Sequence, residues 1–493
     1  MGQSMELGSE LRLHSFGWNI NTRPELLAPA VVPVVCRLLD VHTLSTYSQV
    51  FFDVVDPVYH FLDRARYLER CAAYWAEPPR VLEDFEALVA GVVVLGSFFA
   101  DTPVAVEAEL VEHAKQVLDL GCAYAPGRLS LDQAAAWIAR TLYLRLATRP
   151  HLAWYASCSA MHVVEAMGLH VDLRTVDVAG RGDSSVAALT TPEFVAARRN
   201  LFECASFLNA IISADYGRSR VVLQDSITTT TTTTTAAAAA AAVATTAVLG
   251  SSGLAAAADR PMSKLTALLL RLERDLPRGA RLEILESIYS LPSEPAVFAL
   301  LKTDVAIHLF RRHVHIDQER LSGAESALML TILKAGLAQT RGLLPSHQAW
   351  WNLLFTPFQA LMVLLAIDST ESLELLSETM SLLDAVSHAF PCFLAGEVLQ
   401  TAQTLAKGLE KRKKKQAKLL STASNWTFSS PPPPSSSSAQ NHQATDPDLP
   451  DGSTPASVHP GHAEALLDSW FGGGVDWMDL WNSTDPVLDL NFP

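Results

Sequence analysis

Apolar residues recur at helical spacing through most of the chain. The clearest stripe joins Leu110, Ala114, Val117 and Leu118, which follow the i, i+4, i+7, i+8 pattern of one buried helix face. Charged residues beside this stripe are expected to face water: Glu107, Glu112, Lys115 and Asp119. The alternation of apolar and polar residues that marks a half-buried strand does not compete with this pattern. The sequence therefore predicts an all-α fold.

Short signals predict where several helices begin. A capping side chain before a proline favours a helix start, and a Ser with a Gln three residues later has the spacing of a capping box. A proline also pushes the residue before it out of the α region. The predicted starts are Asp56-Pro57, Thr102-Pro103, Ser130 with Gln133, and Thr191-Pro192.

Two low-complexity stretches interrupt the helical pattern. Eight threonines at 228–235 and seven alanines at 236–242 offer no large side chains to bury, so 226–260 is predicted to be an insertion. After Lys418 the chain has no Lys or Arg, and 421–493 is predicted to be a disordered tail. Residues 1–23 form an N-terminal extension, which leaves 24–420 as one large all-α domain.

Charge and cysteine content narrow the function. The formal net charge is −15, and so acidic a surface repels the phosphates on which nucleic-acid affinity depends. The closest of the six cysteines, Cys36 and Cys71, are 35 positions apart, so no compact zinc site is predicted and buried, reduced thiols are expected. GxSxG, HExxH, Walker and GxGxxG motifs are absent, so no catalytic or cofactor-binding residue is predicted.

The remaining candidates for special sites are weak. His308, His313 and His315 cluster in sequence, but histidines two positions apart do not share a helix face, so a partly exposed helix end is predicted rather than a metal site. No run provides the roughly 20 apolar residues of a spanning helix, and no secretory signal opens the chain. We expect a soluble protein without a membrane partner.

The last thirty residues combine acidic and aromatic side chains. Acidic residues keep apolar ones solvated, and such a segment is typical of transcriptional activation regions that fold into a coactivator groove. Segment 464–493 is therefore a predicted activation segment, with a helix that docks on its own domain as the alternative. Its candidate contact residues are Trp470, Phe471, Asp476, Trp477, Met478, Asp479, Leu480 and Trp481.

A basic cluster precedes the tail. Its length is that of a nuclear import signal, although the end of a solvated helix also gathers cations that complement the helix dipole. No aromatic residues are interleaved with it, so DNA contact is not favoured. The cluster consists of Lys411, Arg412, Lys413, Lys414 and Lys415.

The segment from Trp137 to Leu223 carries a family resemblance. An aliphatic-aromatic helix ends in a Gly-Leu-His turn, and a helix of the form RRxLF…LN…GR follows. The motif residues are Trp154, Met161, Gly168, Leu169, His170, Arg198, Arg199, Leu201, Phe202, Leu208, Asn209, Tyr216, Gly217 and Arg218. Together they resemble the regulatory, or middle homology, domain of fungal zinc-cluster transcription factors, clearest over 47–223 and weaker over 261–400.

The resemblance implies a nuclear regulator of RNA polymerase II transcription. Its helical domain would gate an activation tail in response to a metabolite, and coactivators and a second copy of the chain are expected partners. The motif residues would be structural, with Gly217 providing the positive φ of a helix end. Family members carry a binuclear zinc cluster that reads DNA. This sequence contains none, so zinc is expected only if a cluster lies upstream, and DNA contact would otherwise come through a partner.

Two other classes stay open. One is a non-DNA-binding helical scaffold, or a transcriptional cofactor that acts through a partner. The other is an enzyme with an all-helical pocket.

Overall fold

A computed structural model describes residues 31–124, 130–171, 191–223, 260–272, 276, 279–316 and 321–424. All regular secondary structure within these ranges is helical, which confirms the predicted all-α class. The chain divides between Val363 and Leu364 into two compact units. Among the described residues, no helix is both long and apolar enough to cross a membrane.

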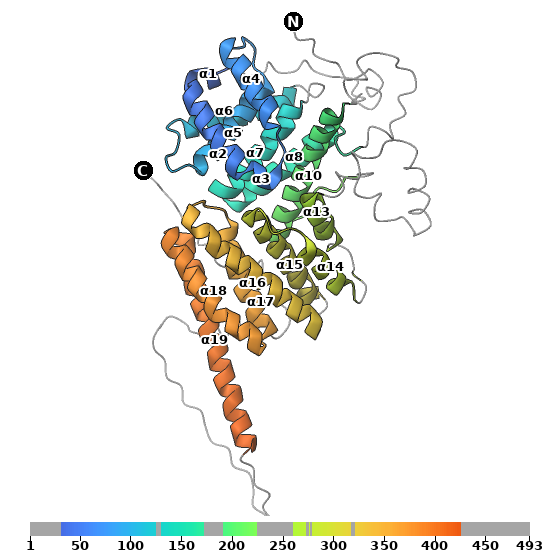
Figure 1. Cartoon of the computed structure of the whole chain (residues 1–493), viewed down its shortest axis with the longest axis vertical. Coiled ribbons are helices and arrows are strands. Elements are labelled where there is room, and N and C mark those ends of the chain that lie inside the picture. The colour runs from blue at the N-terminus through green and yellow to red at the C-terminus, as the bar shows by residue number, and fades with distance from the viewer. Residues whose placement is uncertain are drawn as a thin grey trace, which may run out of the picture. The chain divides into compact units, whose positions relative to one another are not determined.

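The first unit begins with a group of helices around α5 (Asp84–Phe98). Figure 1 shows α2, α6 and α7 gathered about it, and each packs directly against it. Nearly every side chain of α5 is buried, which explains its apolar sequence on all faces. The other helices here are α1 (Val35–Leu38), α2 (Val41–Val54), α3 (Asp56–Tyr59), α4 (Arg64–Ala76), α6 (Glu107–Tyr124), α7 (Leu131–Ala147), α8 (Pro150–Ala166) and α10 (Pro192–Asp215).

Close packing between α2 and α5 depends on a glycine. A Cβ atom at Gly96 would overlap the carbonyl oxygen of Tyr47 on the facing helix. Because that obstacle is backbone rather than a flexible side chain, the two helices approach only with glycine at this position. This close approach fixes the position of α2 against α5 at the centre of the unit.

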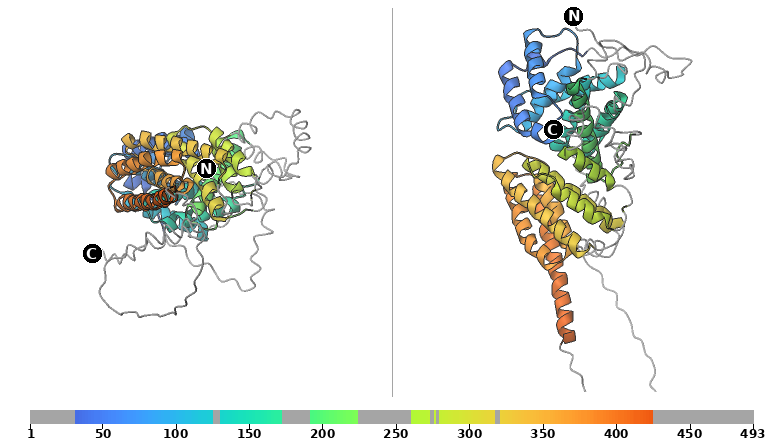
Figure 2. Two further views of the ribbon diagram at one scale, coloured as in Figure 1. Left: turned by 90° about the horizontal axis from the view of Figure 1, so that it is seen from below. Right: turned by 45° about the vertical axis from the view of Figure 1, so that its right-hand side comes forward.

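The rest of the first unit continues from α10 into a second group of helices. α10 contacts both α8 and α13, so it connects the two groups. The two further views of Figure 2 follow the same chain path. The helices are α13 (Pro261–Arg271), α14 (Ala280–Ser290), α15 (Ala296–Ile316), α16 (Gly323–Leu343), the 3-10 turn η2 (Leu344–Ser346), and α17 (Asn352–Ile367), whose last turn passes the division at 363/364.

In the second unit, α18 (Thr370–Ala389) and α19 (Phe393–Ser424) pack against each other as a hairpin. α18 begins with a capping box of Ser369 and Ser372, whose hydroxyls each accept the other's backbone N–H. α19 is the longer helix, and its last turns run on past the start of α18 (Figures 1 and 2).

Three predicted helix starts are confirmed. Asp56-Pro57 opens α3, although Asp56 is itself helical and is not pushed out of the α region. Thr191 caps α10 by accepting the N–H of Phe194, with Pro192 in the first turn. Ser130 caps α7. The reciprocal half of the predicted capping box is wrong, because the side-chain amide of Gln133 donates to Cys122 instead.

The prediction that Thr102-Pro103 starts a helix is wrong, since α6 begins at Glu107. Tertiary hydrogen bonds hold the intervening residues as a loop: Tyr47 donates to the carbonyl of Thr102, and Val104 N–H donates to Ser97 Oγ. These contacts override the local signal.

The predicted stripe on α6 is confirmed, because Leu110, Ala114, Val117 and Leu118 are all buried. One solvent assignment beside it is wrong. Glu107 is half-buried and accepts hydrogen bonds of 2.8 Å from Ser97 Oγ and 2.9 Å from Tyr143 Oη.

Several predictions fall outside the described residues. They concern the extension at 1–23, nearly all of the insertion at 226–260, and the activation segment at 464–493, which keep the status of predictions.

Candidate functional site

The family-motif residues meet where α8 and α10 lie against each other. Gly168, which follows α8, has a positive φ of 64°, and its carbonyl oxygen accepts a 2.7 Å hydrogen bond from Arg198 of α10. Leu169 beside it is buried and His170 is half-buried. The Gly-Leu-His turn and the first arginine of the second motif are therefore in direct contact.

The end of α10 returns to the same helix. Gly217 adopts a φ of 60°, the left-handed conformation predicted for this helix end, and Arg218 N–H then reaches the carbonyl of Ser213 at 2.8 Å. Trp154 of α8 donates to the carbonyl of Ser219 at 3.0 Å, and the Arg218 guanidinium lies 5.4 Å from the Trp154 ring. These contacts are those of a structural junction, the role that the resemblance implied.

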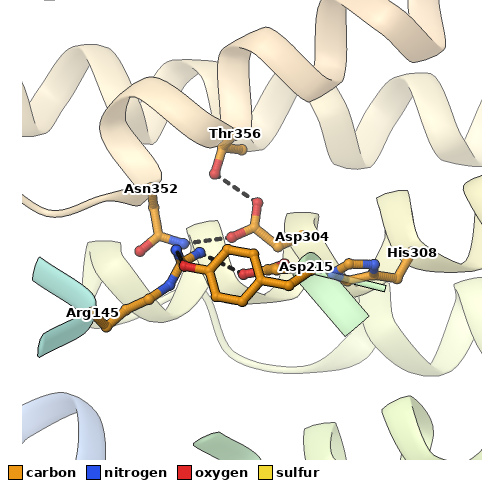
Figure 3. A network of polar contacts seen from close by, with 7 residues as sticks. Arg145, Asp215, Asp304, His308, Asn352 and Thr356 are labelled. Atoms are coloured by element: carbon orange, nitrogen blue, oxygen red, sulfur yellow. Dashed lines mark hydrogen bonds and ion pairs between the residues drawn. The ribbon is translucent and has the colours of Figure 1, made fainter. Parts of the chain in front are cut away.

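A buried polar network lies deeper in the same unit (Figure 3). Arg145 of α7 forms a 2.6 Å ion pair with Asp215 at the end of α10, and its guanidinium also bonds the Tyr216 hydroxyl. The other Asp215 oxygen lies 2.8 Å from Nε2 of His308 on α15. The guanidinium stands 5.1 Å from the Trp351 ring, so the network links α7, α10, α15 and the residue before α17.

Asp304 sits one helical turn before His308 on α15. Its carboxyl accepts a 2.6 Å hydrogen bond from the Thr356 hydroxyl and a second bond from the side-chain amide of Asn352, both from α17. Asp304 is 1% exposed, and Asn352 and Thr356 are fully buried. A carboxyl so enclosed stabilises the packing of α15 on the first turns of α17.

The electrostatics separate the two buried carboxyls. Burial opposes ionisation of Asp215, but the charge of Arg145 and the hydrogen bond of His308 outweigh it and lower the Asp215 pKa. Burial raises the pKa of Asp304 from 3.8 to about 8, with the negative charge of Asp215 acting in the same direction. Burial also lowers the pKa of His308, although the hydrogen bond and charge of Asp215 act in the opposite direction.

A second buried carboxylate organises the N-terminal helices. Glu86 of α5 is fully buried; it accepts hydrogen bonds of 2.7 Å from Tyr74 and 2.9 Å from Val34 N–H, and lies 2.7 Å from the His113 ring. Burial disfavours its charge, but His113 and the backbone donors outweigh that penalty and lower the Glu86 pKa. Glu86 thus ties α1, α4, α5 and α6 together.

A pocket of about 460 Å³ opens between helices α3, α10, α13 and α15. This volume is in the range of small-molecule sites. Two of its charged groups are already engaged, since Glu203 pairs with Arg199 at 2.6 Å and Arg260 bonds Asn200. The other lining residues are Pro57, Val58, Tyr59, His60, Leu62, Cys204, Pro261, Met262, Glu294, Pro295 and Phe298. The pocket suits a small molecule that is largely apolar.

The prediction of a partly exposed histidine cluster is wrong for His308, which is 7% exposed and hydrogen-bonded to Asp215. Its burial follows from its position inside α15, which continues to Ile316. The side chains of His313 and His315 lie outside the description. Within the described residues, no three His, Cys, Asp or Glu side chains gather as a metal site would require, and the six cysteines are unpaired thiols.

The basic cluster lies on the helix α19. Asp368, just before α18, pairs with Lys413 at 2.8 Å and with Arg412 at 3.3 Å. Lys414 pairs with Glu410, and Lys411, Lys414 and Lys415 are exposed. Arg412, Lys413 and Lys414 are thus paired with carboxylates of the second unit itself. The predicted contact residues of the tail, from Trp470 to Trp481, lie outside the described residues.

Comparison with known proteins identifies the family. A family model described as the fungal specific transcription factor domain matches residues 49–232. Protein RDR1 of Saccharomyces cerevisiae is 31% identical over 439 residues, which cover 86% of this chain and 73% of that protein. The chain belongs to the fungal-specific transcription factor family.

Two further relatives of this chain have names that describe transcriptional regulators. Transcription factor kojR of Aspergillus oryzae is 26% identical over 83% of this chain and 69% of its own length. A probable transcriptional repressor of Schizosaccharomyces pombe, C1348.12, is 29% identical over 28% of this chain and 31% of its own length. The match at 49–232 agrees with the predicted resemblance over 47–223.

Motif reasoning missed the buried network and Glu86. Both had a usable signal, because each acidic residue interrupts an otherwise apolar helical run, Glu86 in DFEALVAGVVVL and Asp304 in FALLKTDVAIHLF. A carboxyl in such a run is expected to find buried partners. The partners themselves come from distant segments that spacing cannot connect.

Proposed function

We propose that this chain is a nuclear regulator of RNA polymerase II transcription, in which the helical domain controls an activation segment at 464–493. The proposal is carried by one combination: a domain of the fungal transcription factor family and, in the same chain, an acidic-aromatic C-terminal segment. The neighbouring acidic residues would keep Trp477 and Trp481 solvated until a coactivator groove buries them.

Recruitment to DNA is proposed to come from outside these 493 residues, either from a zinc cluster in a longer form of the chain or from a partner. The net charge of −15 and the absence of any CxxC pair support this division of labour. Nuclear entry is assigned to Lys411–Lys415.

The test is a reporter assay with the chain tethered to a promoter through an unrelated DNA-binding domain that has its own import signal. The wild-type chain should raise reporter output, and Trp477→Ala with Trp481→Ala should remove most of that increase. Trp75→Ala, a tryptophan of α4, serves as the control for loss of an indole elsewhere. Output equal to that of the empty tether, with or without both tail tryptophans, would sink the activation role, and reduced output would indicate a repressor.

Localisation separates this function from that of a helical scaffold outside transcription. A fluorescently tagged chain without an added signal should concentrate in the nucleus, and replacing Lys411–Lys415 with alanine should reduce that accumulation. Nuclear exclusion of both forms would favour the scaffold.

The pocket between α3, α10, α13 and α15 is the proposed site for a small-molecule signal. Leu62→Trp, at a half-buried position of the lining, should narrow the pocket and remove any rise in melting temperature caused by an effector. Leu152→Trp, an exposed position on α8, is the control. An effector that stabilises the Leu62→Trp and wild-type chains equally binds elsewhere.

A further inference from the structure

Within the described residues of its own unit, the C-terminal part of α19 has no partner helix. Asp368 stands at the start of α18 and pairs with Arg412 and Lys413, which marks how far the hairpin extends. Residues 414–424 continue beyond that point, and all of them are exposed. At 1.5 Å per residue they make a helix of roughly 16 Å in water.

This projecting helix continues the buried face of α19. Ala402, Leu405 and Leu409 are buried at spacings of three and four residues. The same face then passes through Lys413 and reaches Leu420, which is 71% exposed, with Leu419 beside it at 64%. The face is therefore apolar in its buried part, at Ala402, Leu405 and Leu409, and apolar again in its exposed part, at Leu420. An exposed apolar surface of this kind is suited to a partner.

The charge of this helix indicates what kind of partner fits. Residues 407–418 contain seven basic side chains and one acidic one, Glu410. The chain after Lys418 contains no Lys or Arg and nine acidic side chains, all between Asp446 and Asp489, so its net charge is opposite to that of the helix. Its aromatic residues, from Trp470 to Trp481, supply apolar groups that match Leu419 and Leu420.

We propose that the segment 464–493 docks on the basic face of α19 between Lys411 and Leu420. The inference rests on the proposed function, which it deepens: docking buries the activation segment and covers the import signal at the same time. The 39 residues between Ser424 and Glu464 can span far more than the length of the helix, so the covalent connection permits the contact. Tethering also raises the effective concentration of the segment without any added contact.

The contact is an electrostatic switch. Exposed pairs of opposite charge are individually weak and are screened by salt, so docking depends on several pairs acting together and is readily displaced. A coactivator competes with α19 for the tryptophans of the tail, and an import receptor competes with the tail for the lysines of α19. Binding of either protein therefore frees the site of the other. Phosphorylation of tail serines would strengthen docking by adding negative charge.

The experiment is zero-length carbodiimide cross-linking of the full chain, which joins amines to carboxylates in direct contact, followed by peptide mass spectrometry of the monomer. We expect cross-links between lysines 411–418 and the carboxylates of segment 464–493. Lys414→Glu with Lys415→Glu should reduce their yield several-fold, as should high salt. The matched control is Lys115→Glu with Lys334→Glu, which reverses the charge of two exposed lysines on α6 and α16. This control should leave the yield of the cross-links unchanged.

Three results would overturn the inference. The first is the absence of these cross-links in the wild-type monomer, and the second is their appearance only between two chains. The third is that the wild-type chain gives no cross-links but binds duplex DNA, and that Lys414→Glu with Lys415→Glu abolishes this DNA binding. The last result would indicate that this part of α19 binds nucleic acid.

The docking proposal and the activation proposal can be rejected independently of each other. In the tethered reporter, Lys414→Glu with Lys415→Glu should raise output above wild type, because the tail is released. Cross-links without any reporter activity would keep the docking contact and reject the activation role. Reporter activity that depends on Trp477 and Trp481 but is unaccompanied by cross-links would do the reverse.

Discussion

Arg198 donates a 2.7 Å hydrogen bond to the carbonyl oxygen of Gly168, joining two family motifs that are 30 residues apart in sequence. Gly168 exposes that carbonyl because its positive φ turns the chain at the end of α8. The arginine is 8% exposed, so the bond is shielded from water. In this chain each of the two motifs thus supplies one partner of the same contact.

Arg198→Met should therefore destabilise the chain by about 1–3 kcal/mol, because a part-buried carbonyl loses its donor while the apolar stem is kept. The neighbouring Arg199→Met removes only a helical i,i+4 pair with Glu203 and should cost about 0.5 kcal/mol. Urea melts followed by circular dichroism measure both. Equal costs would mean that the bond to Gly168 contributes nothing beyond an ordinary pair.

Gly96→Ala tests the close approach of α2 and α5. The added methyl group meets the backbone of Tyr47, which cannot rotate away, so a loss of about 2–4 kcal/mol is expected. Gly342→Ala on α16 meets nothing within 4 Å and should be neutral or stabilise by up to about 1 kcal/mol. Thermal melts of the two variants check the contrast, and a neutral Gly96→Ala would contradict the packing described here.

The ion pair of Arg145 and Asp215 should be costly to break from one side. Asp215→Ala leaves a buried guanidinium without its carboxylate, and a loss of about 3–5 kcal/mol is expected. The double variant Arg145→Met with Asp215→Ala removes the stranded charge and should be more stable than Asp215→Ala alone. A double-mutant cycle from urea melts measures this, and strictly additive losses would show that the two groups do not interact.

Asp304 makes stability depend on pH. Its pKa is raised from 3.8 to about 8, so between these values the folded chain keeps a proton that the unfolded chain has lost. Stability therefore falls as pH rises through this window, and the loss is complete above about pH 8. Asp304→Asn cannot ionise, so its stability relative to wild type should increase by a few kcal/mol between about pH 5 and about pH 9.

Denaturant melts across this pH range provide the measurement for Asp304. The control is Asp119→Asn, whose carboxyl is exposed on α6 and should leave the pH curve unchanged in shape. If wild type and Asp304→Asn kept a constant difference at every pH, Asp304 would not be protonated in the folded chain.

Local patterns predicted the fold class and several details of the fold because their causes are local. The stripe on α6, the cap at Thr191 and the positive φ of Gly217 each depend on residues within a turn or two. The start of α6 failed because Tyr47 and Ser97, far away in sequence, hold residues 102–104 as a loop.

The buried network could not be predicted from residue spacing, because its partners are also far apart in sequence. Arg145 and Asp215 are 70 residues apart, and Asp215 and His308 are 93 apart. Only the apolar setting of a charged residue hints at such a site, and it names no partner. The family motifs were recognisable because their residues stand in the order and separation of the family's pattern, although their contact, Arg198 to Gly168, is visible only in the fold.

The most direct test of the account is rapid depletion of the tagged protein in its native cells, combined with promoter occupancy and nascent-RNA measurements. The account predicts occupancy at a defined set of promoters and, within minutes of depletion, altered RNA polymerase II transcription of those same genes. Absence of promoter enrichment together with unchanged nascent RNA would contradict the assignment of this chain as a transcription regulator.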